Sequence, residues 1–518
     1  MSDDQIRDLF QTAETWSPHN VDGADAADED SSASISSPNA TLPPLQLGSD
    51  VEIAGCVAQY LRQKRGEVIF SEGALWYYAL SHWRQVADYE LRLAVHGFDG
   101  AALPGNRGPV KLSKTRVDSV IHEMTAMLAR PEFFAEAPVG INCASGFIAF
   151  ASDGTPTLRP HDPEHRCRHV LRGSWNSGWL ADEETIFVAL KSLGLLLACL
   201  LEGVFFGDAD GKDKRQLLAE IAGAAALGYG NKLRQPKAII LEGKTAENGK
   251  SQVLDVFRGL LPPQAIASIP AAKMGDQHFV VGLVGKHLNA SDELSGADAI
   301  AGDVFKAVVT GEPVTGRDLY RPAVTFRSVA QNVFATNALP SFKGGMDRGV
   351  QRRLLVITFN RTIPEDERVE NIGSRIADEE ADFLLRWAVA GASRLIGQRA
   401  FTMPPSSRVA LRDWLLGADP VLAWLQSCVE DVDPKSSDGT KARIKSKDAY
   451  KNFVHWAQGE GFRENTLPAI NGFIQRLRAN RPSIEAKHGR DGNFLTGIRL
   501  VASVSEPEAA DFFAGKTH

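Results

Sequence analysis

The middle of the chain alternates short apolar runs with longer segments of helical periodicity. Residues 238–241 (AIIL) are apolar without interruption, and apolar side chains then recur at helical spacing through residues 251–261. Further apolar runs end at Asp292 and Asn337, and another covers residues 354–357. Strands that alternate with helices in this way are typical of a layered α/β fold. The pattern therefore predicts an α/β domain over residues 236–400.

The segments before and after this domain have different patterns. Residues 51–180 mix predicted helices with short strands rich in aromatic and β-branched residues, which indicates a separate α/β helper domain. Its predicted elements are a helix over residues 51–65, strands at 68–70, 75–78 and 83–86, a helix over 117–128 and a strand pair over 140–150. Residues 181–235 form a predicted helical linker, interrupted by a Gly- and Asp-rich turn. The Pro- and Ser-rich residues 402–407 predict a linker into a final module over residues 401–518.

Composition and cysteine placement narrow the class of protein. The five cysteines have no repeated spacing, which favours reduced thiols over a disulfide framework. The apolar stretch at residues 193–201 is much shorter than the roughly 20 residues of a membrane span. The acidic N-terminus lacks the apolar core of a signal peptide. We therefore expect a cytoplasmic protein without a membrane partner.

The formal charge of -7 conceals two regions of opposite character. Residues 1–50 are acidic and rich in Ser, Pro and Asn, a composition that predicts a disordered tail. Residues 441–499 are basic, and their pattern predicts two helices followed by a two-stranded wing. Such a winged-helix module binds duplex DNA through basic side chains, and the candidates are Arg476, Arg478, Arg481 and Lys487. Winged helices also serve as protein-docking modules, and this alternative stays open.

Residues 241–252 (LEGKTAENGKSQ) join the first apolar strand to its helix. They contain Gly-Lys-Ser at residues 249–251, the end of a phosphate-loop motif, but Gly243 lies one residue too far upstream for its start. Backbone N–H groups of such a loop hold phosphates, its lysine reaches the β and γ oxygens, and its hydroxyl binds Mg²⁺. The alternative is a polar turn without a ligand. We interpret Gly243 as the end of the strand, with Lys244 in the first position of the motif.

Polar residues also follow two later strands. Asp292 and Glu293 come directly after an apolar run, and Asn337 ends another. The first acid could hold the water shell of Mg²⁺ and the second could polarise an attacking water, while Asn337 could contact the γ-phosphate or orient that water. The alternatives are a solvated helix cap for the two acids and a turn for Asn337.

Five blocks in a fixed order resemble the superfamily-3 helicase domain of phage and poxvirus primase-helicases. The blocks read NGKSQ, LVGKHLNASDELSG, FKAVVTGEPVTGRDLYRPAVTFR, NVFATNALP and RGVQRRLLVITFNRTIP. With GFIAFASDGTPTLRPHDPEH upstream, the resemblance covers residues 64–396, most of the folded chain. It implies a P-loop NTPase core of the AAA+ kind, which uses ATP and Mg²⁺, assembles as a homo-hexameric ring and translocates on single-stranded DNA.

The resemblance assigns roles residue by residue. Lys250 matches the phosphate-loop lysine and Ser251 the Mg²⁺-binding hydroxyl, and the nucleotide-binding residues are Asn248, Gly249, Lys250, Ser251 and Gln252. The second acidic motif, with its Mg²⁺-binding and water-activating carboxylates, and the sensor asparagine are matched by Asp292, Glu293 and Asn337. An arginine finger, offered to the nucleotide of a neighbouring subunit, is expected from Arg352 and Arg353, with Arg348 as a nearby alternative. Ordinary surface ion pairs are the other interpretation of these arginines.

The chain departs from the family at two places. Lys306 matches the start of the block that tracks DNA in the channel of the ring, but Leu319 stands where a lysine is usual. Arg317 and Arg321 could supply the positive charge for the DNA phosphates instead. The phosphate loop also lacks glycine where relatives have it, at Lys244 among others, which allows a rearranged loop.

The resulting expectation is a replicative DNA helicase of a phage, prophage or mobile element, acting in a bacterial host cell. Its expected partners are single-stranded and forked DNA and a separate primase or other replication proteins. A separate primase is expected because the acidic tail is too short and too polar to form one. The alternatives are an initiator or helicase loader in which ATP acts as an assembly switch, and a nucleotide-dependent scaffold whose ATPase has decayed.

Overall fold

The computed structural model describes residues 44–105, 107–176, 182–292, 299–319, 323–343, 345–432, 443–462, 467–489 and 492–501. Its contacts divide the chain into two compact units. We call the first, Met1–Pro340 with Arg352–Ser407, the large unit, and the second, Ser341–Gln351 with Arg408–His518, the C-terminal unit. Most of the predicted acidic tail, residues 1–43, lies outside the described residues.

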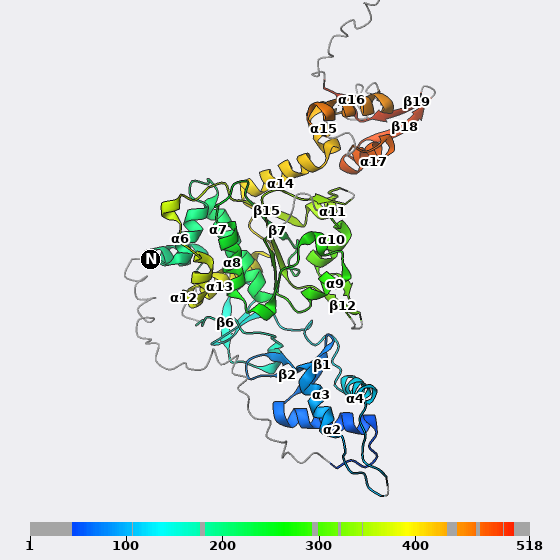
Figure 1. Ribbon diagram of the computed structural model, residues 1–518. Coiled ribbons are helices and arrows are strands. Elements are labelled where there is room, and N and C mark those ends of the chain that lie inside the picture. The colour runs from blue at the N-terminus through cyan, green and yellow to red at the C-terminus, as the bar shows by residue number, and fades with distance from the viewer. Residues whose placement is uncertain are drawn as a thin grey trace, which may run out of the picture. The chain divides into compact units, whose positions relative to one another are not determined.

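The core of the large unit is a sheet of five parallel strands in the order β15-β7-β13-β9-β8, of which Figure 1 labels β15 and β7. The strands are β15 (Leu354–Thr358), β7 (Ala238–Glu242), β13 (Gln331–Thr336), β9 (Leu288–Ser291) and β8 (Ile266–Ala267). Most of their side chains are buried, which explains why these strands are continuous apolar runs in the sequence. Because β13 lies between β7 and β9, the residues that follow these three strands meet at one edge of the sheet. The predicted α/β layer is confirmed.

Helices pack around this sheet and against one another. α8 (Lys250–Leu260) contacts α12 (Ile372–Glu379), and α7 (Gly211–Leu227) runs along α13 (Ala381–Gln398). The α7–α13 contact needs glycine, because a Cβ on Gly391 would lie 1.9 Å from the carbonyl oxygen of Ala219. The large unit also contains α5 (Glu183–Ser192), α6 (Leu196–Val204), α9 (Gln277–Val280), β10 (Ala299–Ile300), α10 (Gly302–Thr310), β11 (Pro313–Gly316) and β12 (Val324–Arg327).

A buried carboxylate ties α7 to the end of α13 and the segment that follows it. The side chain of Glu220 is fully buried and accepts hydrogen bonds from Arg394 Nε at 2.8 Å, Gln398 Nε2 at 2.6 Å and both the N–H and the hydroxyl of Thr402. Burial raises the pKa of Glu220, while the bonds from Thr402 and Arg394 oppose that shift. The buried carboxylate therefore joins four donors from α13 and the segment after it, although Arg394 and Gln398 themselves are exposed.

We expect Glu220→Ala to lower the free energy of unfolding by about 3 kcal/mol, because it removes the buried acceptor that four hydrogen bonds share. Urea unfolding followed by circular dichroism would measure this change. The matched control is Glu379→Ala, whose carboxylate forms an exposed pair with Arg375 and should leave the midpoint where it was. Equal midpoints for both variants would contradict a structural role for Glu220.

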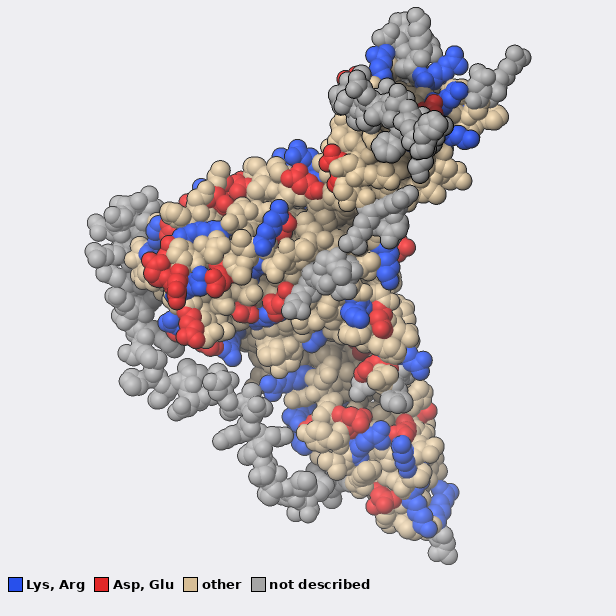
Figure 2. All heavy atoms as spheres, turned by 45° about the horizontal axis from the view of Figure 1, so that its top comes forward, with Lys and Arg blue, Asp and Glu red and all other residues tan. Residues whose placement is uncertain are grey.

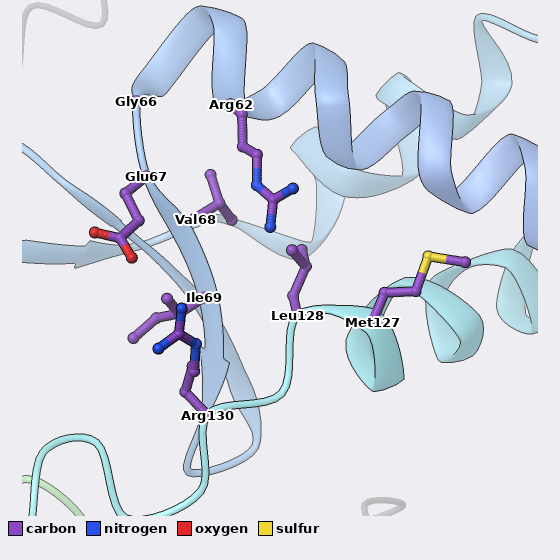
Figure 3. A pocket seen from close by; sticks show the side chains of 8 residues that line it. All are labelled: Arg62, Gly66, Glu67, Val68, Ile69, Met127, Leu128 and Arg130. Atoms are coloured by element: carbon purple, nitrogen blue, oxygen red, sulfur yellow. The ribbon is translucent and has the colours of Figure 1, made fainter.

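The helper part of the large unit follows its sequence pattern closely. α2 (Asp50–Arg65) and α4 (Lys114–Met127) pack together beside the β1-β2-β3 sheet, as predicted. The elements are β1 (Val68–Ser71), β2 (Ala74–Tyr78), β3 (Trp83–Gln85), α3 (Asp88–His96), β4 (Gly140–Cys143), β5 (Gly146–Phe150) and β6 (Pro156–Arg159). A hollow of about 350 Å³ opens between the ends of α2 and α4, where Arg62 and Arg130 lie over an apolar floor that includes Val68 (Figure 3). This hollow is distinct from the phosphate loop.

The C-terminal unit has its own small core around Trp424, Phe453 and Phe473. Within it α15 is followed by two strands, two helices and three strands, which pair in the orders β17-β19-β18 and β16-β20. Its elements are β14 (Ser341–Phe342), α11 (Arg348–Gln351), α15 (Pro420–Cys428), β16 (Val429–Asp431), β17 (Arg443–Lys445), α16 (Ser446–Gly459), α17 (Ile470–Asn480), β18 (Glu485–Gly489), β19 (Gly492–Thr496) and β20 (Ile498–Leu500). The predicted pair of helices followed by a hairpin is confirmed.

The segment expected to be a linker begins a helix instead. α14 (Pro405–Ala418) starts inside residues 402–407. Its first residue is proline, which is compatible with the first turn of a helix because no N–H is needed there. The proline-rich composition therefore marks the start of this helix.

Among the described residues, no single helix is long and apolar enough to cross a membrane. α5 and α6 reach that length and composition only as a pair, and they are bent by 115°. Leu197, Leu200 and Leu201 of α6 are buried in the core of the large unit. Packing within the protein accounts for this apolar stretch, as the sequence indicated.

Candidate nucleotide-binding site

The loop between β7 and α8 has the predicted order of strand, loop and helix. β7 ends at Glu242 and α8 begins at Lys250. Gly249, which precedes the helix, has φ of 82°, and a Cβ there would lie 2.5 Å from Cγ1 of Val204. Only glycine fits this position without strain. The backbone N–H groups at the start of α8 are thus presented at the edge of the sheet, where a helix N-terminus favours an anion.

Lys250 points back into this loop and is almost fully buried. Its Nζ donates to the carbonyl oxygen of Gly243, to Oδ1 of Asn248 and to Oδ1 of Asn337, each at 3.0 Å. Burial lowers the pKa of Lys250, and the charge of Glu242 opposes that shift. The structure therefore brings together three residues that the sequence placed in one site, although Asn337 is 87 positions from Lys250.

Gly243 directly follows β7 and leaves room for this lysine. Its N–H donates to the carbonyl oxygen of Thr336 at 3.2 Å, which extends the pairing of β7 with β13. A Cβ on Gly243 would lie 2.2 Å from Nδ2 of Asn248 and 2.7 Å from Nζ of Lys250. The glycine is needed here because these side chains approach the backbone. This role explains why it stands one residue before the usual first position of the motif.

The loop is fastened to a segment that the sequence did not connect with it. Glu247 has φ of 59°. Its Oε2 accepts from Nη2 of Arg368 at 2.6 Å, and the carbonyl oxygen of Glu247 accepts the N–H of Ile363 at 2.9 Å. Oε1 of Gln252 accepts the N–H of Gly373 at 3.0 Å. Glu247 of the loop is thus held by residues between β15 and α12, and Gln252 of α8 accepts from Gly373 within α12.

Asp292 follows β9, as predicted, but its carboxylate contacts an arginine of α8. Oδ2 of Asp292 accepts from Nη2 of Arg258 at 2.7 Å, and the same nitrogen donates to the carbonyl oxygen of Ala290. Ser251 is exposed at the start of α8, seven residues before Arg258, which is about 10 Å along a helix. In the described part of the chain, no contact joins Asp292 to Ser251. Glu293 lies outside the described residues.

The candidate finger arginines differ in exposure. Arg353 is buried, with Nη2 3.9 Å from Oε1 of Glu312, whereas Arg352 is exposed and its carbonyl oxygen accepts from Nζ of Lys237. Both precede β15, so they lie at the edge of the sheet opposite the phosphate loop, about 17 Å away along a five-residue strand. Arg348 is exposed at the start of α11, in the C-terminal unit.

The predicted DNA-tracking block forms α10 and the antiparallel hairpin of β11 and β12. Lys306 on α10 pairs with Asp303 at 2.9 Å. Arg317 directly follows β11, and Leu319, near the tip, is 67% exposed. Arg321 lies outside the described residues. The hairpin therefore presents a large apolar side chain where the family pattern has a lysine.

The predicted basic residues of the C-terminal unit fall into two groups. Acidic partners lie next to three of them: Asp419 is 4.0 Å from Arg476, Asp431 contacts Arg481, and Glu485 is 2.8 Å from Lys487. Arg478 is exposed on α17 and has no ion-pair partner among the described residues. The structure thus separates one unpaired arginine from the other candidates.

Comparison with known proteins gives one family and one group of structures. The profile of a family of unknown function, DUF5906, matches residues 241–353, from the phosphate loop to the arginines before β15. No curated protein matches the chain. Three structures of the apo C-terminal region of NrS-1 are similar in fold, at 12%, 14% and 13% identity with TM-scores of 0.40, 0.38 and 0.41. They cover 85%, 85% and 86% of this chain and 98%, 97% and 99% of theirs.

Proposed function

We propose that this chain is an ATP-dependent DNA helicase for the replication of a phage, prophage or mobile element. The observation that carries the proposal is the 3.0 Å hydrogen bond between Nζ of Lys250 and Oδ1 of Asn337. It joins the lysine of a strand-loop-helix unit to a polar residue on the neighbouring parallel strand, at the edge where α/β sheets bind their ligands. A polar turn without a ligand gives no reason to bury an ammonium group among three acceptors.

The residues around the loop fit Mg-ATP. The start of α8 offers backbone N–H groups to the phosphates, and Lys250 needs only to turn outward to reach the β and γ oxygens. Ser251 is exposed beside Lys250 and, with Asp292, would hold Mg²⁺, which neutralises phosphate charge when bound. We assign activation of water to Glu293 and its orientation to Asn337.

A shared site between subunits accounts for the arginines. Because Arg352 and Arg353 lie opposite the phosphate loop of their own chain, an arginine finger from this pair can act only on the nucleotide of a neighbour. Arg352 is the better candidate, since it is exposed while Arg353 is buried beside Glu312. A homo-hexameric ring supplies such neighbours, and the hairpin of β11 and β12 would face single-stranded DNA in its channel.

The test is an ATPase assay with and without single-stranded DNA, combined with strand displacement on a forked duplex. Turnover that DNA stimulates, together with displacement, supports the helicase. DNA-stimulated turnover without displacement supports the second candidate, an ATP-switched initiator or helicase loader. The separate duplex-facing winged-helix module that we infer for α15–β19 favours that candidate. Absence of turnover in both conditions would contradict the helicase.

A variant of Arg258 tests the Mg²⁺ assignment. Arg258 competes with the metal for Asp292, so Arg258→Ala should lower the Mg²⁺ concentration at half-maximal ATP hydrolysis by about 5-fold. A Mg²⁺ titration at saturating ATP would measure this. Arg375→Ala, which removes another helix arginine from an exposed pair, is the matched control. An unchanged Mg²⁺ requirement in Arg258→Ala would remove Asp292 from the metal site.

A further inference from the structure

α17, the second of the two helices before the β18–β19 hairpin, has one buried face and one exposed face. Phe473 and Leu477 are fully buried and pack in the core of the C-terminal unit. Asn471, Gln475 and Arg478 are exposed and lie within an arc of about 60° on the opposite side, at 100° per residue. No described residue forms a side-chain hydrogen bond or ion pair with any of these three. The outward face of the helix therefore carries an amide, a second amide and a guanidinium that have no partners within the described chain.

The three side chains line one hollow along the helix. The hollow has a volume of about 530 Å³, and its walls also include Ile474, Ala479 and Pro482. From Asn471 to Arg478 the helix rises about 10 Å. This length corresponds to about three base steps of duplex DNA, which rises 3.4 Å per base on each strand. The neighbouring side chains are small or apolar, so they leave the three polar groups accessible to a partner such as duplex DNA.

The chemistry of this face matches base edges. Asn and Gln form two hydrogen bonds with the N6 and N7 atoms of adenine in the major groove, and Arg does so with O6 and N7 of guanine. Protein-docking surfaces favour aromatic and large apolar anchors instead, and the hollow includes only Ile474 of this kind. The combination of two amides and one arginine on a single helix face therefore favours binding to the edges of DNA bases.

Charge in the same unit favours a polyanion. Over its described residues from 443 to 501, nine lysines and arginines stand against three acidic residues, and basic side chains gather on its surface (Figure 2). Lys445, Lys447 and Lys451 are exposed and have no ion-pair partner in the described parts of the chain. Such lysines neutralise phosphates without distinguishing sequence. They complement a helix whose own outward face is polar.

We propose that α17 is a recognition helix that reads the sequence of duplex DNA through Asn471, Gln475 and Arg478. This proposal rests on the assignment of the C-terminal unit as a winged-helix DNA-binding module. It adds a sequence preference to that assignment: a purine-rich site of about three base pairs that contains guanine opposite Arg478 and adenine opposite at least one amide. The lysines provide affinity, and the three α17 side chains provide the choice of sequence.

The experiment is selection from a randomised duplex library by the full-length protein without ATP, with excess oligo(dT) present to occupy a single-strand site. We expect one enriched motif. Arg478→Ala should reduce discrimination at one guanine by about 10-fold, and Gln475→Ala or Asn471→Ala should relax preference at an adenine. Arg476→Ala is the matched control, because this arginine of the same helix lies beside Asp419 and should leave the preference intact.

Lys447→Ala gives a contrasting result. It should weaken binding to all duplexes evenly and reduce the salt dependence of binding by about one phosphate contact. No enriched motif, or an Arg478→Ala variant that loses affinity for every sequence equally, would overturn the proposal and leave either unspecific DNA binding or protein docking. ATP hydrolysis without duplex DNA should stay unchanged in all four α17 variants. Failure of the recognition helix is thereby distinguishable from failure of the ATPase.

Discussion

Lys250→Ala lowers kcat for ATP hydrolysis by at least about 100-fold, the usual effect of removing a charged group that stabilises the transition state. No other described cation contacts Asn337, so the variant removes the ammonium that lies against this residue. Initial rates of phosphate release with saturating single-stranded DNA measure the loss. Lys191→Ala, which removes an exposed lysine of α5 paired with Glu202, is the control and keeps the wild-type rate.

The same variant separates loss of catalysis from loss of folding. Lys250→Ala should unfold at the same urea concentration as wild type or a higher one, because burial already disfavours the lysine charge in the folded protein. Turnover in Lys250→Ala at the wild-type rate would exclude this loop as the site of hydrolysis. A variant that equals the wild type in every assay would favour a nucleotide-dependent scaffold whose ATPase has decayed.

Arg352→Ala gives the second large effect, a loss of turnover of about 1,000-fold with nucleotide binding retained. Fluorescent ADP binding and phosphate release measure the two properties. The control is Arg348→Ala, an exposed arginine of the C-terminal unit, which should keep its activity if Arg352 is the finger. The reverse outcome, with activity lost only in Arg348→Ala, would assign the finger to Arg348.

Mixing two inactive variants tests whether the site is shared. In an equal mixture of Lys250→Ala and Arg352→Ala subunits, about one interface in four combines an intact lysine with an intact arginine, so turnover should reappear. Pure Lys250→Ala and pure Arg352→Ala remain inactive. A mixture as inactive as its components would contradict a nucleotide site between subunits.

The sequence alone was sufficient to predict the strands and the helix that position the site. The strands β7, β9, β13 and β15 are buried on both faces, so they stand out as apolar runs, and the periodicity of α8 follows from its single buried face. Lys250 and Asn337 could be assigned to one site because parallel strands place their C-terminal ends at a common edge. In the structure a hydrogen bond joins the two side chains.

Pairs of side chains distant in sequence could not be predicted in this way. Nothing in the pattern indicated that Arg258 would contact Asp292, or that Arg368 would fasten Glu247, because long side chains choose partners by three-dimensional proximity. The exposure of Arg352 beside a buried Arg353 could not be predicted either. Adjacent side chains point in opposite directions as the chain enters a strand, but the pattern does not show which of the two faces the protein. The sequence did offer one indication that Arg258 belongs near the site. Arg258 stands seven residues after Ser251, which is two turns along the helix.

The place that Gly243 leaves for Lys250 has a consequence for affinity. The ammonium has three acceptors within the protein, so ATP must compete with the protein's own oxygens for the same charge. At about 1 kcal/mol for each hydrogen bond exchanged, this competition weakens ATP binding by roughly 5-fold per bond that is not replaced. These three oxygens thereby act as intramolecular competitors of the phosphates, and they raise the ATP concentration at which the site is half occupied.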